Sequence, residues 1–440
     1  MDHPLRATLA NELHARPFLR LEGSVALAHL AVYAEDNSTV HDVLLRDLCA
    51  LSGLPEPADS CTHYVANWSE HRQLKWERHT EFSTYTFVAA RDDDDYFSDL
   101  ATEHVPQEWF AGIAGKRFVG IRMELVSGSR APEARANYRQ WIDGPIAAGS
   151  RALGNGEVFC DWTIKPDSFS RFLIIDDGFR EAQSGRLLQR LYEIETYRMM
   201  ALLALPVARQ LGQSLDTLQR TLGVLLKSMD RDQADRDDSQ LLGDLTHLAV
   251  RSEALAECGH RFSASRAYEK LVLARIQELR EERIDGIPTI AEFMERRFAP
   301  AMDTCKASWN RLEQFTVRVA RAIDLLRTRV SLVQEANTTR LLEGMDRTAR
   351  SQLHLQHAVE GLSVAAISYY VLSLTGVALK SLHAADFSVD HELVEGLLIA
   401  PVVALVFFIT RRSKRHGGNK EVSSHMSREN SGKPSTAEPT

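Results

Sequence analysis

The sequence has few of the motifs that mark common catalytic and metal-binding sites. Its five cysteines include no Cys-x-x-Cys pair, which argues against a thiolate zinc site or a dithiol redox pair. The patterns G-x-x-x-x-G-K-[ST], H-E-x-x-H and G-x-S-x-G do not occur, and no G-x-G-x-x-G follows a predicted strand. The usual phosphate, zinc-protease and serine-nucleophile arrangements are therefore missing. We expect a protein that is not an enzyme and that holds no cofactor.

Basic residues are in the minority, and no secretion signal is seen at the start. Lysine and arginine number 52 against 60 acidic residues, for a formal net charge of −8, so a nucleic-acid partner is not expected. The opening stretch MDHPLRATLANELHARPF carries charges throughout and has no apolar run of signal-peptide length. This pattern predicts a cytoplasmic N-terminal part with reduced cysteines.

The first 178 residues alternate short strand-like and helical runs, as in a mixed α/β domain. Three of the strand-like runs follow one another with only a few polar residues between them. Because such gaps are too short for crossover helices, these three runs should form an antiparallel meander. The predicted strands are 24–33, 62–68, 72–78, 83–90, 117–126, 157–164 and 171–176, and the predicted helices are 4–14, 38–53, 104–112 and 132–141.

The second half of the chain shows helical periodicity. Apolar residues three and four apart predict one helix over 180–231, kinked at Pro206, and a second over 239–284. The charged turn DRDQADRDD separates them, so the two should pack as an antiparallel hairpin.

A third helix should begin after Gly286-Ile287-Pro288, where Thr289 and Glu292 have capping-box spacing. A kink is expected at Pro300, with 289–299 as a separate short helix. From Pro300 to His357 the helix would measure about 85 Å, and up to about 100 Å with its extensions. A stalk of this length needs the preceding hairpin, further copies of itself, or both as partners. Its expected heptad seam is Phe298, Met302, Cys305, Trp309, Leu312, Thr316, Val319, Ile323, Leu326, Val330 and Val333.

Two apolar stretches near the C-terminus predict a transmembrane hairpin. The spans are 358–379 and 393–410, and the second leads directly into RRSKR. Because basic residues stay on the cytoplasmic side, both termini should lie in the cytoplasm. The last residues lack apolar content, which is typical of a disordered tail.

Three groups of residues are candidate sites. One line on the first span places small and hydroxyl residues together, either for helix packing within the hairpin or for lining a pore. An acidic loop between the spans faces outward, and an acidic run follows the fourth predicted strand as a solvated turn or a cation site. The groups are Gly361, Ala365, Ser368, Thr375 and Gly376; Asp386, Asp390 and Glu392; and Asp92, Asp93, Asp94 and Asp95.

The stalk start also carries Glu292, Arg296 and Arg297. We expect these residues to form an (i, i+4) pair and a junction contact, although an anion site is the alternative.

The order of these parts resembles that of the CorA-type magnesium channels. Those channels carry a Gly-Met-Asn signature at the outer end of the first span, whereas here Gly376 is followed by Val377 and Ala378. The resemblance implies a cation conduit made of several copies, with Mg²⁺ as its ion.

Two stretches, HPLRATLANELHARPF near the start and TIAEFMERRFAPAMDTC at 289–305, are similar to a bacterial family of predicted membrane-anchored proteins of unknown function. That resemblance spans the chain and implies location in the bacterial inner membrane.

The sequence thus predicts an α+β fold with a membrane hairpin. We expect a membrane-anchored cytoplasmic interaction or scaffold protein, with a homo-oligomeric CorA-like cation channel as the alternative. The expected partners are the lipid bilayer, further copies through the stalk, and a cytoplasmic protein. The predicted parts are an α/β domain (1–178), a helical hairpin (179–288), the stalk (289–357), the transmembrane hairpin (358–410) and a basic tail (411–440).

Overall fold

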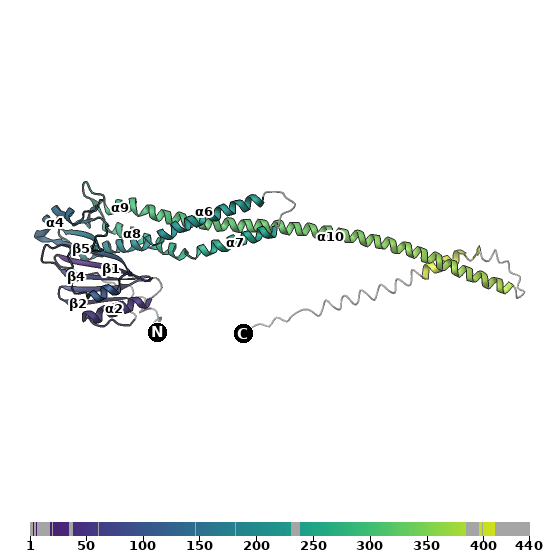
Figure 1. Ribbon diagram of the computed structural model, residues 1–440, viewed down its shortest axis with the longest axis horizontal. Coiled ribbons are helices and arrows are strands. Elements are labelled where there is room, and N and C mark those ends of the chain that lie inside the picture. The colour runs from purple at the N-terminus through teal and green to yellow at the C-terminus, as the bar shows by residue number, and fades with distance from the viewer. Residues whose placement is uncertain are drawn as a thin grey trace. The chain divides into compact units, whose positions relative to one another are not determined.

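The computed structural model divides into two units, Met1–Arg327 and Thr328–Thr440 (Figure 1). Each unit is described by itself below. The structure describes residues 3, 6, 18–19, 21–34, 38–59, 61–145, 147–180, 182–229, 238–383, 396–397 and 399–409. The predicted helix 4–14, apart from Arg6, and the tail 411–440 lie outside these residues.

A nine-stranded sheet organises the first unit, in the order β2-β3-β4-β1-β5-β8-β7-β6-β9. All neighbouring strands are antiparallel except β5 and β8, which are parallel. The strands are β1 (Val25–Tyr33), β2 (His63–Ser69), β3 (Arg72–Arg78), β4 (Phe82–Ala90), β5 (Arg117–Ser127), β6 (Ala148–Ala152), β7 (Gly156–Cys160), β8 (Ser170–Asp176) and β9 (Glu282–Arg283).

The meander predicted for the first strands is confirmed, since β2, β3 and β4 pair in sequence order. Two strands were not predicted. The segment AGSRA of β6 has no β-branched or aromatic residue to signal a strand. The two-residue β9 exists only because it pairs with β6, at Ser150 and Arg151.

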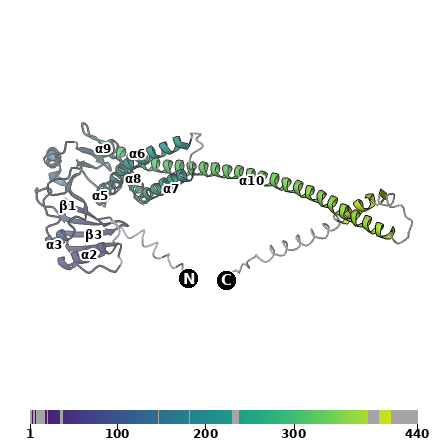
Figure 2. The ribbon, with the colours of Figure 1, turned by 45° about the vertical axis from the view of Figure 1, so that its right-hand side comes forward.

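Helices cover both faces of the sheet (Figure 2). On one face α2 (Ser38–Ser52) and α3 (Gln107–Gly112) bury Leu45 and Trp109 against β1, β3 and β4. Further along that layer, α4 (Ala131–Asn137) packs against β5 and β8.

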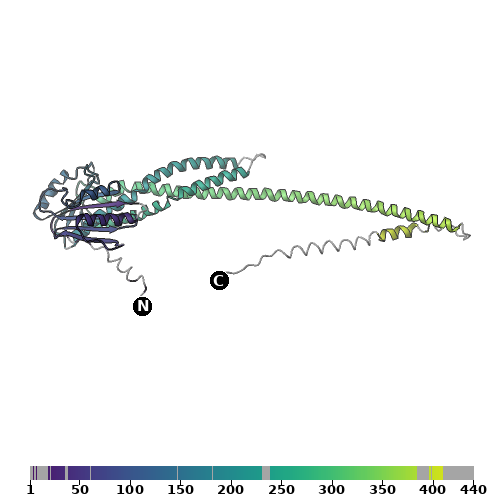
Figure 3. The same ribbon diagram turned by 60° about the horizontal axis from the view of Figure 1, so that its bottom comes forward.

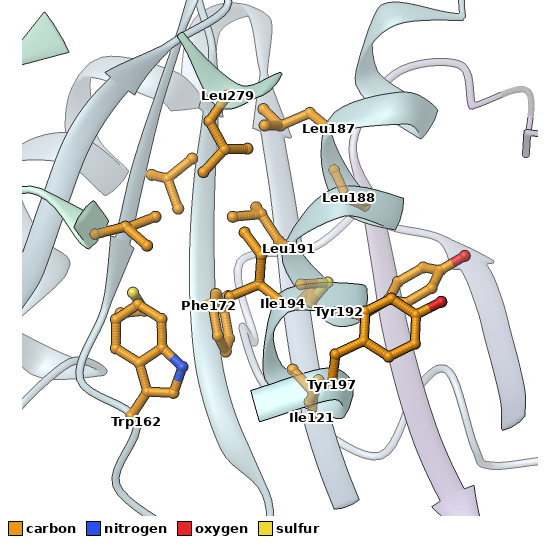
Figure 4. Close-up of a cluster of buried hydrophobic side chains, with 14 of the residues drawn as sticks. Ile121, Trp162, Phe172, Leu187, Leu188, Leu191, Tyr192, Ile194, Tyr197 and Leu279 are labelled. Carbon is orange, nitrogen blue, oxygen red and sulfur yellow. The ribbon is translucent and has the colours of Figure 1, made fainter. Parts of the chain in front are cut away.

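The opposite face is covered by α5 (Gln183–Leu202), α8 (Gly259–Leu279) and α9 (Ile290–Arg297). One face of α5 projects onto the strands at Ile121 and Phe172 (Figure 4). Its apolar residues are spaced three or four apart, as on one side of a helix, and are fully buried: Leu187, Leu188, Leu191 and Ile194. At Gly185 an added Cβ would lie 1.9 Å from the Leu19 carbonyl oxygen, so only glycine lets the N-terminal backbone lie against α5.

The two long helices expected after the sheet are each broken. The first becomes α5 and α6 (Ala204–Met229), with the break at Leu203. It falls ahead of Pro206 because proline is tolerated in the first turn of α6, where its missing N–H has no partner to lose. The second becomes α7 (Asp238–Ala256) and α8, separated by Glu257 and Cys258.

The start of the third helix is as predicted. Thr289 and Glu292 form a complete capping box ahead of α9. The chain leaves the helix at Phe298 and then enters α10 (Ala299–His383), so Pro300 stands in the first turn of α10. The short separate helix before Pro300 is therefore confirmed.

Within the first unit α10 packs against the α6–α7 hairpin (Figures 1 and 3). The predicted helix is confirmed, but its buried seam shifts by one residue at alternate positions. Ser308, Phe315 and Ala322 are buried where Trp309, Thr316 and Ile323 were expected. The last two predicted members of the seam, Val330 and Val333, are not buried. A helix that faces two others buries a stripe wider than a two-helix seam, and this width explains the shift. The buried positions are Phe298, Met302, Cys305, Ser308, Leu312, Phe315, Val319, Ala322 and Leu326.

The second unit contains the rest of α10 and a shorter apolar helix, Ile399–Ile409. Gly344 does not interrupt α10, because one glycine in a helix interior costs only about 1 kcal/mol relative to alanine. The shorter helix lies beside the end of α10 in all three ribbon views (Figures 1, 2 and 3).

Candidate functional site

The final turns of α10 carry an uncovered apolar surface. Residues 361–378, called the apolar segment below, contain no charged side chain. Of these 18 residues only Ser368 and Gly376 are buried. Within the described residues, α9 and α10 hold one stretch long and apolar enough to cross a membrane, and 11% of its window is buried.

The predicted small-residue line divides into two parts. Gly361 and Ala365 are exposed, whereas Ser368 and Gly376 are buried and Thr375 is half-buried. The Thr375 hydroxyl donates to the Val371 carbonyl oxygen at 2.7 Å. The buried Ser368 hydroxyl has no hydrogen-bond partner among the described residues. In the shorter helix Val406 is buried, so the two helices cover one face of each other.

The outer acidic residues Asp386, Asp390 and Glu392 lie outside the described residues.

The acidic run Asp92–Asp95 forms a loop over a buried arginine. Arg91 is fully buried and donates from Nη1 to the Asp93 carboxylate at 2.5 Å and to the Asp95 carbonyl at 2.7 Å. Arg130 donates to the Asp93 carbonyl at 2.7 Å and approaches the Asp94 carboxylate at 3.7 Å. In the part of the chain that the structure describes, no group of three carboxylate, imidazole or thiol side chains is placed to hold a metal ion.

The main partner of Arg91 is Glu124 on β5. Arg91 Nε donates to Glu124 Oε2 at 2.7 Å and Nη2 donates to Oε1 at 2.9 Å, a bidentate pair with both side chains buried. The Phe97 N–H adds a third bond to Oε1 at 2.7 Å. Burial raises the pKa of Glu124, and the Arg91 guanidinium opposes that shift. The loop thus satisfies a charge pair inside the sheet layer.

A second buried polar cluster centres on His29 of β1, between the sheet and α5. Its Nδ1 lies 2.8 Å from the Thr86 hydroxyl and its Nε2 lies 3.2 Å from the Thr196 hydroxyl. The ring stacks on Tyr192, which Figure 4 shows on α5, with centroids 4.1 Å apart. Burial, and next the Lys75 ammonium, lower the pKa of His29 from 6.5 to about 3. His29 is therefore a neutral imidazole at physiological pH.

The cluster has room for little beyond a solvent molecule. The cavity beside His29 measures about 20 Å³, enough for about one water. Lys75 and Glu77 form a buried ion pair at 3.3 Å on strand β3, which is separated from β1 by β4. Both His29 ring nitrogens have a hydroxyl partner, whereas the buried Tyr192 hydroxyl has no hydrogen-bond partner among the described residues, and the cavity is too small for a substrate.

Comparison with protein families shows which family the chain belongs to. A family model described as "Protein of unknown function (DUF3422)" matches residues 1–417. The chain belongs to the DUF3422 family. No curated protein and no solved structure matches it.

The DUF3422 match runs through both apolar stretches, which end before residue 417. The stretch 289–305, singled out from the sequence alone, forms α9 and the first turns of α10.

Sequence reasoning missed the two buried polar clusters of this DUF3422 chain. A signal exists for His29, since it is the one polar residue in the strand VALAHLAVY. Arg91 and Glu124 carry no such signal, because they are 33 residues apart and meet only through the sheet.

Proposed function

We propose that this DUF3422 chain is a membrane-anchored interaction protein, held in the bilayer by the apolar segment of α10 and the helix Ile399–Ile409. The observation that carries the proposal is the exposure of the apolar segment, of which two residues in 18 are buried. Exposed apolar patches of this size usually meet a membrane or a protein. Eighteen helical residues rise about 27 Å, close to the hydrocarbon thickness of a bilayer.

The charges around the apolar stretches support an orientation. Arg411, Arg412, Lys414 and Arg415 follow the second stretch directly, and basic residues flanking a span favour the cytoplasmic side. In this proposal the two termini and the first unit lie in the cytoplasm of a bacterial cell, at its inner membrane.

The first unit has a surface that suits a cytoplasmic partner. A groove of about 720 Å³ lies beside Phe169, with Arg117 and Arg122 over the ring at 5.1 and 4.6 Å. Arg122 is paired with Asp99 and lies 3.8 Å from Asp167. Arg117 forms no ion pair among the described residues, so it can receive an acidic group of a protein partner.

The anchor is tested by charging the apolar segment. Ile367→Arg with Val371→Arg places two guanidiniums near the middle of the span, at a cost of about 2.5–3.5 kcal/mol each. We expect the chain to move from the alkali-resistant membrane fraction to the extractable fraction. The matched control is Leu341→Arg with Leu342→Arg, which changes exposed leucines outside the segment; this control should stay in the membrane. Equal extraction of both variants would contradict the anchor.

The second candidate function is a homo-oligomeric conduit for cations. It is favoured by an exposed apolar stripe on the same helix, whose members fall within about 100° of one another at about 100° per residue. Identical copies could pair through such a stripe. The apolar stripe is Leu341, Met345, Leu355, Val359 and Leu362, exposed by 70, 69, 69, 56 and 73%.

Light scattering of the detergent-solubilised chain separates the two functions. A ring of several copies that Met345→Glu with Leu355→Glu dissolves would support the conduit and lead to ion-flux assays. The control, Leu342→Glu with Leu353→Glu, changes exposed residues off the apolar stripe and should leave the ring intact. A monomeric unsubstituted chain would overturn the conduit and leave the anchored protein.

A further inference from the structure

A cleft of about 300 Å³ opens in the first unit where α9 meets α10. Its lining comes from four parts of the chain: Pro145 ahead of β6, the segment after β7, the end of α5, and the α9–α10 junction. The residues used below are Trp162, Arg198, Leu202, Phe293, Arg297 and Phe298.

Two helix breaks meet at this cleft. Leu202 ends α5 just before the break at Leu203, and Phe298 is the residue between α9 and α10. The sequence stretch 289–305 supplies Phe293, Arg297 and Phe298. A ligand here would contact Phe298, the residue immediately before α10.

The apolar wall of the cleft is rigidly held. Trp162 adopts a left-handed backbone conformation, with φ of 50°, that turns the chain after β7. Its ring stacks on Phe293 with centroids 4.6 Å apart and meets the edge of Phe172 at 5.5 Å; Figure 4 shows Trp162 beside Phe172. Two flat rings locked together form a preorganised surface for a planar apolar group.

The charges that face the cleft sum to one positive charge. Asp161 lines it, but its side chain is fully buried and accepts from the Gly144 and Thr163 N–H groups and from Lys165, at 2.8, 3.0 and 2.7 Å. Arg198 is neutralised by Glu195, with two bonds of 2.7 Å, although its Nη1 has no acceptor among the described residues.

Arg297 is exposed and forms no ion pair within the described residues. The expected (i, i+4) ion pair of Glu292 with Arg296 does not form among the described residues, and Glu292 pairs with Arg283 instead.

We infer that this cleft binds a small monoanion with a flat apolar body, of the size and chemistry of an aromatic carboxylate. The rings of Trp162 and Phe293 take the apolar body, and Arg297 with Arg198 Nη1 takes the carboxylate. One uncompensated positive charge matches one negative charge. A multiply charged phosphate would leave charge unpaired against apolar walls.

The test uses naphthalene-2-carboxylate as the probe, on the full chain in a non-ionic detergent, with isothermal titration calorimetry. We expect saturable binding of one probe per chain, and weaker binding of the neutral naphthalene-2-carboxamide by about tenfold. Arg297→Gln should reduce carboxylate affinity by about tenfold and leave the carboxamide unchanged. Arg296→Gln is the matched control, since Arg296 is its exposed neighbour outside the lining, and it should bind as the unsubstituted chain does.

Hydrogen exchange places the bound probe. Occupancy should slow exchange of amides in 290–299 and leave those of α7 unchanged. Absence of saturable binding, or equal losses in Arg297→Gln and Arg296→Gln, would overturn the inference. None of these results depends on whether the apolar segment lies in a bilayer, so failure here and failure of the anchor are distinguishable.

Discussion

The two parts of α10 differ in burial although they belong to one helix. From Ala299 to Leu326 every turn places a side chain in the core of the first unit, and Val319 and Leu326 are fully buried. From Thr328 to Ala378, most leucine, valine and methionine side chains of α10 are exposed instead, and Val330, Val364 and Leu372 are half-buried. Helical periodicity therefore does not reveal whether an apolar side chain has a protein partner. The apolar segment within this exposed part requires a partner outside the single chain, and we propose the bilayer.

The largest expected effect is a loss of stability when a charge is placed in the buried part of α10, compared with the same change in the exposed part. Val319→Asp puts a carboxylate into the α6–α7–α10 core, and burying an unpaired charge should lower the free energy of unfolding by about 4 kcal/mol or more. Leu342→Asp, in the exposed part, should change it by less than about 0.5 kcal/mol. Urea unfolding followed by tryptophan fluorescence measures both. Similar losses in the two variants would contradict the assigned burial.

A somewhat smaller effect contrasts a buried ion pair with an exposed one. Arg91→Leu leaves Glu124 buried without its cation and should cost about 3–5 kcal/mol. The control is Arg350→Leu in the second unit, where Arg350 pairs with Asp346 at 2.7 Å and both side chains are mostly exposed; its loss should cost less than about 1 kcal/mol. The same unfolding assay applies. A near-neutral Arg91→Leu would mean that Glu124 finds another partner or is neutral.

The smallest effect is a pH dependence that belongs to the first unit. The pKa of His29 falls from 6.5 to about 3 on folding, so its contribution to stability is complete above pH 6.5 and is lost as the pH falls toward 3. Between pH 6.5 and 5 that loss is about 2 kcal/mol, at about 1.4 kcal/mol per pH unit. His29→Gln should flatten this slope. His354→Gln, which replaces an exposed histidine of α10, should leave it unchanged.

The sequence predicts the parts of the fold that depend on local patterns. The meander, the capping box at Thr289 and the helix that begins after it follow from spacing and turn residues. Helix breaks are harder, because the position of Leu203 depends on how α5 and α6 pack and only indirectly on Pro206. Strand β6 is missed for a similar reason, since its small residues are strand-forming only between β7 and β9.

The functional regions are predictable to different degrees. The apolar segment is evident from composition alone, and the structure adds that Ser368 and Gly376 face a covered side. The cleft at Trp162 could not be predicted, because it joins residues from 162 to 298 through tertiary packing and depends on a left-handed backbone at a tryptophan. Arg297 was expected to make a junction contact, and the structure places it in the lining of that cleft.

The most direct test of the account is the depth of α10 in a bilayer. Spin labels at Val333→Cys, Leu342→Cys, Ile367→Cys and Val371→Cys would be compared by power saturation in liposomes, with the unsubstituted chain reporting background from its own cysteines. The account predicts that labels at 367 and 371 are relaxed by oxygen and protected from a water-soluble nickel chelate, whereas labels at 333 and 342 show the reverse. Full access of the chelate to all four positions would contradict the membrane anchor.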